Sequence, residues 1–124
     1  MTNPRFSKLF SPLEIGKLTI KNRIMSTGHD TGLPTNGVVN DALIAYQLSR
    51  ARGGVGLIVL QVSGVHETAR YTNHILMATD DTAIEGYRRI ADAVHPFGTR
   101  IFAQLFHPGK EIMETSDGMR TPAY

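Results

Sequence analysis

The sequence predicts a domain of the α/β class, in which parallel strands alternate with helices. Two segments, 55–65 and 100–106, are nearly continuous runs of apolar and β-branched residues, which is typical of strands buried in a parallel sheet. A segment with helical periodicity precedes each run, and the connections are short. This order indicates βαβ units, so we expect either a helix-covered sheet or a barrel.

The N-terminal stretch LFSPLEIGKLTIKNRI, residues 9–24, predicts a β-hairpin that leads into the first strand. Apolar residues alternate on both sides of a turn at Gly16 and Lys17, and they are Leu13, Ile15, Leu18, Ile20 and Ile24. The next stretch, MSTGHDTGLPTNGVV, has no period and is rich in Gly, Thr and Pro. Residues 25–39 are therefore predicted to form a loop.

The first helix is predicted to follow Asn40, which is a favourable N-cap residue, and to end at Gly53 and Gly54. Its apolar face is expected to consist of Ile44, Leu48 and Ala51.

The second helix is predicted to start with a capping box formed by Thr82 and Glu85, and to stop at Pro96 and Gly98. Its expected apolar face consists of Ile84, Tyr87, Ala91 and Val94. The run RIFAQLF that follows, residues 100–106, completes the pattern as another buried strand.

Length and composition limit the class of protein. The 124 residues suit one domain, but a complete eightfold α/β barrel needs roughly 250. Lys and Arg are scattered and the formal net charge is +2, which argues against a nucleic-acid partner. No apolar run reaches ~20 residues and no signal-peptide pattern is present, so we expect no membrane partner and a cytoplasmic location.

The sequence contains no cysteine, which excludes disulfides, zinc–thiolate sites, iron–sulfur ligation and a cysteinyl link to a cofactor within this span. The histidines at 66 and 74 lack metal-ligand spacing, so no metal site is predicted.

Three predicted strand ends carry small or polar residues where a core would place Val or Leu. They are STGHD (26–30), QVSG (61–64) and QLFHPGK (104–110). Because ligands of parallel α/β folds bind at the carboxyl ends of the strands, we expect these three stretches to meet one ligand.

Several motifs together resemble the start of the Old Yellow Enzyme family of flavin-dependent oxidoreductases. They are LFSPLEIGKLTIKNRI, RARGGVGLIV and DDTAIEGYRRIADAVHPFGTRIFAQLFHPGK, and the resemblance runs from Leu9 to Lys110. The loop STGHDTG is most similar to the branch that contains the dienoyl-CoA reductases and trimethylamine dehydrogenase.

This resemblance implies a (β/α)₈ TIM barrel that binds FMN at its C-terminal face. NADH or NADPH would reduce the flavin and an electron-poor alkene or related acceptor would reoxidise it, so the expected substrate is an unsaturated (enone or enoyl) or amine-type compound. The residues that match flavin-contacting positions of the family are Thr27, Gly28, His29, Asp30, Val62 and Gln104. Gln104 matches a glutamine that binds the pyrimidine side of the ring, where one carboxamide can both donate and accept.

Other interpretations of single residues remain open. Gln104 could be a buried amide that neighbouring backbone groups satisfy, and His29 could be a loop residue that faces solvent. Asp30 departs from the family, in which Cys or Thr is common, and a carboxylate near a reduced flavin would be repelled. We therefore expect Asp30 to turn away, to be paired, or to be protonated.

The resemblance also implies that the proton donor and the phosphate site lie beyond the matched region, so the catalytic residues are not among those named above. Residues 1–124 are expected to form a single partial domain, the first three βα units of a flavin-binding barrel. The alternative hypothesis is a non-catalytic partial barrel that acts as a binding or assembly module. Its open sheet edge would then need self-association, which predicts a homo-oligomer.

Overall fold

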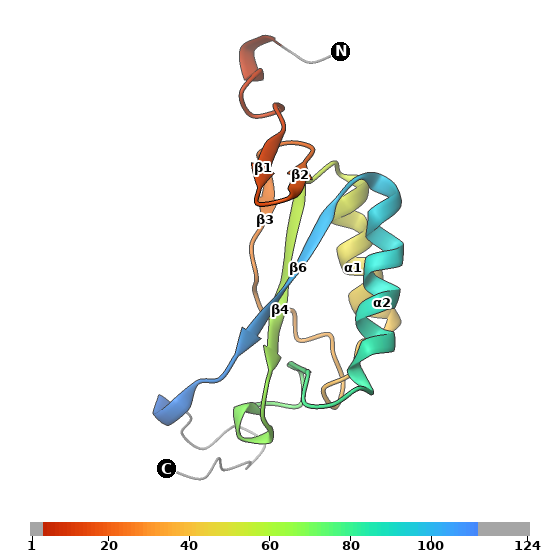
Figure 1. Ribbon diagram of the computed structural model, residues 1–124. Helices are drawn as coiled ribbons and strands as arrows, with labels where there is room; N and C mark the ends of the chain where they lie inside the picture. Colours follow the sequence, from red (N-terminus) through yellow and green to blue (C-terminus); the bar gives the residue numbers. More distant parts are fainter. Residues whose placement is uncertain (1–3, 112–124) are drawn as a thin grey trace.

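The computed structural model describes residues 4–111, which form a parallel sheet with both long helices on one of its faces (Figure 1). The strands and α-helices, in chain order, are β1 (Leu13–Ile15), β2 (Leu18–Ile20), β3 (Met25–Ser26), α1 (Asp41–Arg52), β4 (Leu57–Gly64), β5 (Leu76–Met77), α2 (Ala83–Val94) and β6 (Arg100–Phe106). The predicted α/β class and the βαβ order are confirmed.

Strand β4 is the centre of the sheet. Strand β6 pairs with it in parallel along its whole length, from Leu57 opposite Arg100 to Gly64 opposite Phe106. The other edge of β4 pairs in parallel with β3 near its start and with the two-residue strand β5 near its end. The sequence analysis missed β5, although the apolar residues 75–77 that contain it are all buried.

A β-bulge interrupts the pairing of β4 with β6. Val59 lies opposite Phe102 and Val62 lies opposite Gln104, so β4 has one residue more than β6 between these pairs. The extra residue changes the alternation of side chains. As a result Val62, and not Gln61, shares a face with Gln104.

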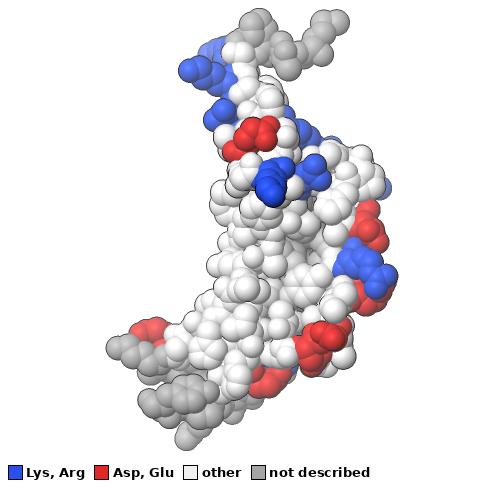
Figure 2. All heavy atoms as spheres, in the orientation of Figure 1, with Lys and Arg blue, Asp and Glu red and all other residues white. Residues whose placement is uncertain are grey.

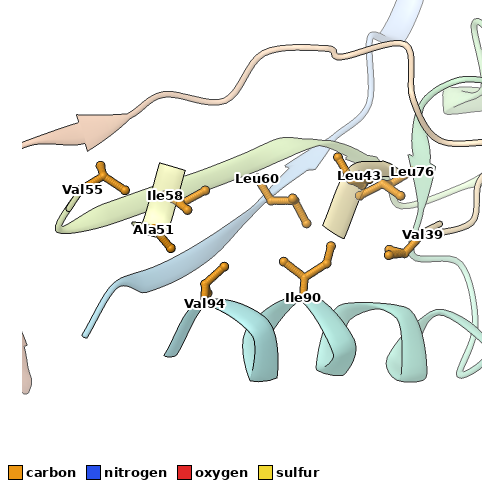
Figure 3. Close-up of a cluster of buried hydrophobic side chains, with 9 residues drawn as sticks. All are labelled: Val39, Leu43, Ala51, Val55, Ile58, Leu60, Leu76, Ile90 and Val94. Carbon is orange, nitrogen blue, oxygen red and sulfur yellow. The ribbon is translucent and has the colours of Figure 1, made fainter. Parts of the chain in front are cut away.

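The hydrophobic core lies between the sheet and the two helices (Figure 3). It consists of Val39, Leu43, Ala51, Val55, Ile58, Leu60, Leu76, Ile90 and Val94. Several of these side chains are fully inaccessible to solvent, and each contributes about 1.5–3 kcal/mol by burial.

The predicted hairpin is confirmed and lies at the end of the sheet where β4 begins (Figure 1). Gly16 makes its turn with a φ of 59°. Just after β2, Asn22 donates a hydrogen bond from Nδ2 to the carbonyl of Gly54 at 2.8 Å, and its Oδ1 accepts one from the Ile24 N–H at 3.1 Å. The bond to Gly54 attaches the end of the hairpin to the turn between α1 and β4, away from the carboxyl ends of the strands.

The start of α1 is confirmed and the capping of α2 is corrected. Asn40 caps α1 by accepting the N–H of Leu43 at 3.0 Å. Thr82 makes no capping bond, because its own N–H and hydroxyl both donate to the carboxylate of Asp80, at 2.8 and 2.5 Å. The hydroxyl is therefore a donor here, and the capping box with Glu85 does not form.

The apolar faces of the helices also differ from the prediction. On α1 the buried residues are Leu43, Gln47 and Ala51, because the helix packs against α2 as well as the sheet. On α2, Ile90 and Val94 are buried, whereas Ile84 is 56% exposed because it lines an open groove between α2 and β6.

Strand β6 exists as predicted, but the prediction that it is buried is wrong for the described residues. Ala103, Gln104 and Leu105 are exposed, and Leu105 reaches 69%. The reason is that β6 has only one strand neighbour, β4, within residues 4–111. In the same part of the chain, no helix is long and apolar enough to cross a membrane.

Candidate functional site at the carboxyl ends of the strands

Gly28, Val62 and Gln104 come together on the face of the sheet away from the helices. Val62 and Gln104 are register partners on β4 and β6. A Cβ atom added to Gly28 would lie only 2.1 Å from Oε1 of Gln104 and 3.2 Å from the carbonyl oxygen of Leu60. The loop after β3 therefore lies directly against the other two strands, and the close approach requires glycine.

The Gln104 carboxamide is exposed and makes no hydrogen bond with any residue in the described part of the chain. It is thus neither buried nor satisfied by neighbouring backbone, which removes that alternative within these residues. The amide retains its capacity to donate and accept hydrogen bonds next to a glycine. The face seen in Figure 2 is also free of Lys, Arg, Asp and Glu over the middle of β4 and β6.

Thr27 and His29 lie at the edge of this arrangement. Nδ1 of His29 is 2.9 Å from the carbonyl oxygen of Thr27, and Nε2 contacts the hydroxyl of Tyr46 on α1. Because a carbonyl can only accept, Nδ1 carries the proton and Nε2 accepts from the Tyr46 hydroxyl. The His29 ring, although exposed, is held against the Tyr46 ring with 5.7 Å between the ring centres.

Asp30 is paired, which selects one of the three alternatives expected from the sequence. It accepts a hydrogen bond from the hydroxyl of Tyr71, in the segment between β4 and β5. The Tyr71 ring meets the ring of Phe106 edge-on, with centres 5.7 Å apart. Partial burial of the Asp30 carboxyl raises its pKa above the ordinary value, and the neighbouring His29 acts in the opposite direction.

Gln61, which precedes Val62, belongs to a structural network on the helix side. It is 1% exposed, accepts from the Thr31 hydroxyl at 2.6 Å, and donates to the carbonyl of His74 at 3.2 Å. These bonds satisfy the buried amide and hold the loop after β3 in place.

Sequence reasoning missed Tyr46 and Tyr71, which hold His29 and Asp30. Tyr71 lies in a polar stretch after β4, so the rule that ligands meet strand ends could have drawn attention to it. His107, at the end of β6, makes a structural hydrogen bond, since its Nε2 lies 2.8 Å from the Thr68 hydroxyl. Residues 4–111 contain no cluster of three or more side chains of the kinds that bind metal ions.

Comparison with known proteins gives a consistent assignment. A sequence model of the NADH:flavin oxidoreductase / NADH oxidase family matches residues 8–123. The chain is 43% identical over 104 residues to a metal reductase of Desulforamulus reducens, covering 84% of this chain and 15% of that protein. It is 40% identical over 108 residues to an NADH oxidase of Thermoanaerobacter brockii, covering 86% and 17%.

Solved structures agree with the sequence relatives. The Old Yellow Enzyme homologue of Zymomonas mobilis superposes with a TM-score of 0.80 at 30% identity, over 92% of this chain and 32% of that one. Morphinone reductase in complex with tetrahydroNAD also gives 0.80, at 29% identity, over 96% and 32%.

The chain therefore spans between about one sixth and one third of the length of these relatives, and the described residues form the N-terminal portion of a (β/α)₈ barrel. The branch within the family stays a prediction. The motifs at the strand ends, the fold and the sequence relatives agree that this chain belongs to the NADH:flavin oxidoreductase / NADH oxidase family, which includes the Old Yellow Enzymes.

Proposed function

We propose that this chain supplies the pyrimidine-side part of the FMN site of an oxidoreductase. The complete enzyme would transfer hydride from NADH or NADPH, through the flavin, to an unsaturated (enone or enoyl) substrate. With an amine-type substrate the amine itself would give hydride to the flavin, which an electron acceptor would then reoxidise. The observation that carries the proposal is the convergence of Gly28, Val62 and Gln104, with the Gln104 carboxamide unpaired among the described residues.

The residues present fit a flavin ring. The edge of an isoalloxazine alternates donors and acceptors, and the exposed Gln104 amide can satisfy two neighbouring ring atoms. Gly28 allows the backbone to come close, and Val62 offers an apolar contact on the same face. FMN would supply the hydride-accepting chemistry, while these side chains orient the ring.

The other predicted contacts belong to the loop after β3. The backbone of residues 27–30 can reach the same space as Gly28. The His29 side chain would not bind the flavin directly, since both of its ring nitrogens already have partners. We therefore propose that Thr27, His29 and Asp30 contribute mainly through backbone groups and loop shape.

An FMN titration of the purified chain tests the proposal, with flavin fluorescence and visible absorption as readouts. We expect Gln104→Ala to weaken FMN binding by about five- to tenfold, the value of one or two lost hydrogen bonds. Arg100→Ala is the matched control, because Arg100 is an exposed residue of the same strand at the end away from the site. A folded chain that bound no FMN, or bound it equally well after Gln104→Ala, would contradict the proposal.

The names of the relatives support electron transfer to small molecules without selecting a substrate. They include a metal reductase, an NADPH dehydrogenase of Bacillus subtilis and an N,N-dimethylglycine/sarcosine dehydrogenase of Chromohalobacter salexigens. Because the chain covers 15–31% of these proteins, the substrate class remains part of the proposal. NAD(P)H-dependent reduction of an enone, or reduction of the bound FMN by a tertiary amine, would distinguish the two classes.

A second candidate function is self-assembly, which the exposed edge of the sheet favours. Leu105 and Ile84 line an apolar groove between β6 and α2 and are 69% and 56% exposed. We propose that a second copy of this chain covers the groove and pairs with the β6 edge. Size-exclusion chromatography should then show a dimer that Leu105→Glu disrupts, and a well-behaved wild-type monomer would contradict it.

A further inference from the structure

The segment between β4 and β5, residues 65–75, connects the ends of the strands that carry the candidate site. On one side the N–H of Val65 donates to the carbonyl of Phe106 at 3.2 Å, and Thr68 contacts His107 just beyond β6. On the other side the Tyr71 hydroxyl donates to Asp30, in the loop after β3. Residues 65–75 are called the bridging segment below.

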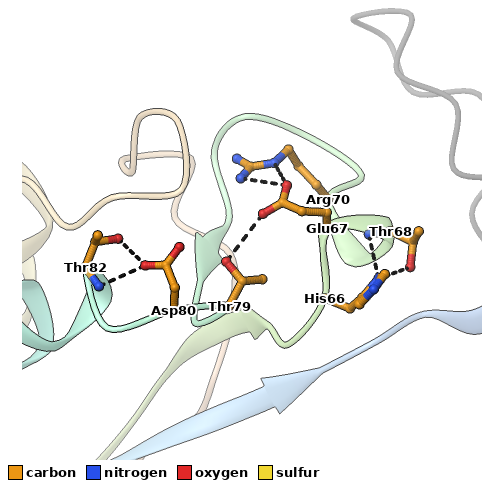
Figure 4. A network of polar contacts seen from close by, with 7 residues as sticks. All are labelled: His66, Glu67, Thr68, Arg70, Thr79, Asp80 and Thr82. Carbon is orange, nitrogen blue, oxygen red and sulfur yellow. Dashed lines mark hydrogen bonds and ion pairs between the residues drawn. The ribbon is translucent and has the colours of Figure 1, made fainter.

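The anchor on the β6 side has a defined hydrogen-bond direction. The N–H of Gly109 donates to Nδ1 of His107 at 3.0 Å, so the proton of the neutral ring lies on Nε2 and is donated to the Thr68 hydroxyl. The hydroxyl in turn lies 2.9 Å from Nδ1 of His66, which also accepts the N–H of Thr68 at 3.3 Å. Figure 4 shows His66 and Thr68 within the polar network of this segment.

The anchor on the β3 side lies just beyond the point where Gly28 meets Gln104. Asp30 is two residues past Gly28, and Phe106, against which the Tyr71 ring packs, is two residues past Gln104 on the same face of β6. Two residues of a strand span about 6.6 Å. Tyr71 therefore links the loop after β3, through its bond to Asp30, with β6, through its contact with Phe106, close to the place where Gly28 meets Gln104.

We propose that Asp30 and Tyr71 are positioning residues of the flavin site, whose hydrogen bond holds the loop after β3 at a fixed distance from Gln104. The inference rests on the proposed function, because it assigns a role to residues beside the flavin contacts. Asp30 acts here as a hydrogen-bond acceptor and not through its charge, so an amide oxygen at the same position can replace it.

The loop after β3 needs such an anchor. Thr31 is held by Gln61 and His29 by Tyr46, whereas the partner of the Asp30 side chain among the described residues is Tyr71. Gly32, with a φ of 68°, is exposed. If a loop becomes ordered only when the ligand binds, the affinity for the ligand is lower, because the loop loses its conformational entropy on binding. The bridging segment orders the loop beforehand through Tyr71.

A double-mutant cycle tests the inference, with the FMN dissociation constant and amide hydrogen exchange of residues 27–31 as readouts. We expect Tyr71→Phe and Asp30→Ala each to weaken FMN binding by about fivefold and to speed exchange in the loop. The double variant should be no weaker than either single variant, because both remove the same bond. Asp30→Asn should behave like the wild type. Tyr87→Phe is the matched control, because its hydroxyl binds Ser63 on the helix side.

Each alternative gives a different pattern. Additive losses of FMN affinity in the double variant would overturn the positioning role. Equal losses in Asp30→Asn and Asp30→Ala would also overturn it, because they would show that the charge of Asp30 is needed and not only its hydrogen-bond acceptor. If the folded wild-type chain binds no FMN, the proposed function fails for this chain. Amide hydrogen exchange still tests the anchor in that case. If Tyr71→Phe leaves the exchange rates of residues 27–31 unchanged, the hydrogen bond between Tyr71 and Asp30 does not order the loop.

Discussion

Substitution of Gly28 by alanine should separate the stability of the fold from the capacity to bind flavin. The added methyl group would lie 2.1 Å from Oε1 of Gln104 and 3.2 Å from the carbonyl oxygen of Leu60. The backbone at Gly28 is outside the left-handed region, so alanine itself introduces no dihedral strain. The Gln104 side chain is exposed and can rotate away, at a cost of about 0.5–1.5 kcal/mol, while the contact with Leu60 needs only a small shift.

We therefore expect Gly28→Ala to lower the free energy of unfolding by no more than about 1.5 kcal/mol. Its effect on FMN should be larger, because the methyl group blocks the close approach and displaces the amide that binds the ring. Loss of the Gln104 hydrogen bonds together with the steric conflict should weaken FMN binding by at least about tenfold.

Urea denaturation and an FMN titration of the same preparation measure both quantities. Gly16→Ala is the matched control, because Gly16 has a φ of 59°, has no other atom within 4 Å of an added Cβ, and lies in the hairpin away from the site. It should cost about 1 kcal/mol of stability and leave FMN binding unchanged. The reasoning is refuted if Gly28→Ala binds FMN like the wild type, or if it costs 3 kcal/mol or more of stability.

Three further predictions concern the structural networks. Gln61→Ala should lower the free energy of unfolding in urea by about 2–4 kcal/mol, because it removes a buried amide with two hydrogen bonds; a loss below 1 kcal/mol would contradict this. Bonds from the Thr82 hydroxyl and N–H hold the pKa of Asp80 below its ordinary value of 3.8, so stability from this carboxylate is present at neutral pH and is lost as the pH falls through that lowered pKa. Thr82→Ala should bring the pKa of Asp80 back toward 3.8 in a carboxyl NMR titration, and an unchanged value would exclude the hydroxyl as the cause. Burial raises the pKa of the Tyr87 hydroxyl above 10.0, so the unfolded chain loses this proton at a lower pH than the folded chain, and the free energy of unfolding should fall above about pH 10. Tyr87→Phe should reduce this alkaline loss of stability in urea titrations at pH 9 and 11. An equal loss in both proteins would contradict the prediction.

The sequence allowed the order of elements to be predicted because each strand and helix has a local signal. The alternation around Gly16 predicted the hairpin, and the continuous apolar runs predicted β4 and β6. Asn40 marked the start of α1 because its side chain accepts the N–H of Leu43, only three residues along the chain. At Thr82 the same reasoning failed, since the Asp80 carboxylate two residues earlier is the stronger acceptor and engages the hydroxyl as a donor.

The candidate site was predicted only where it depends on strand ends. The carboxyl-end rule selected the stretches that contain Gly28, Val62 and Gln104, and the structure brings these three together. The partners of His29 and Asp30 could not be predicted, because they are 17 and 41 residues away along the chain and no periodicity links them. Exposure of β6 was also missed, since an apolar run indicates a strand but not the number of its neighbours.

The bulge in β4 explains how one strand serves both the core and the candidate site. With strict alternation, Leu60 and Val62 would face the helices together and Gln61 would face the candidate site. The extra residue instead leaves Leu60 in the core and Gln61 in its network with Thr31, and then directs Val62 toward Gln104. Gln104 can therefore be polar within an apolar strand, because both Gln104 and its register partner Val62 face away from the helices and the core. The face of β4 and β6 that carries Val62 and Gln104 is therefore separate from the core that the helices cover.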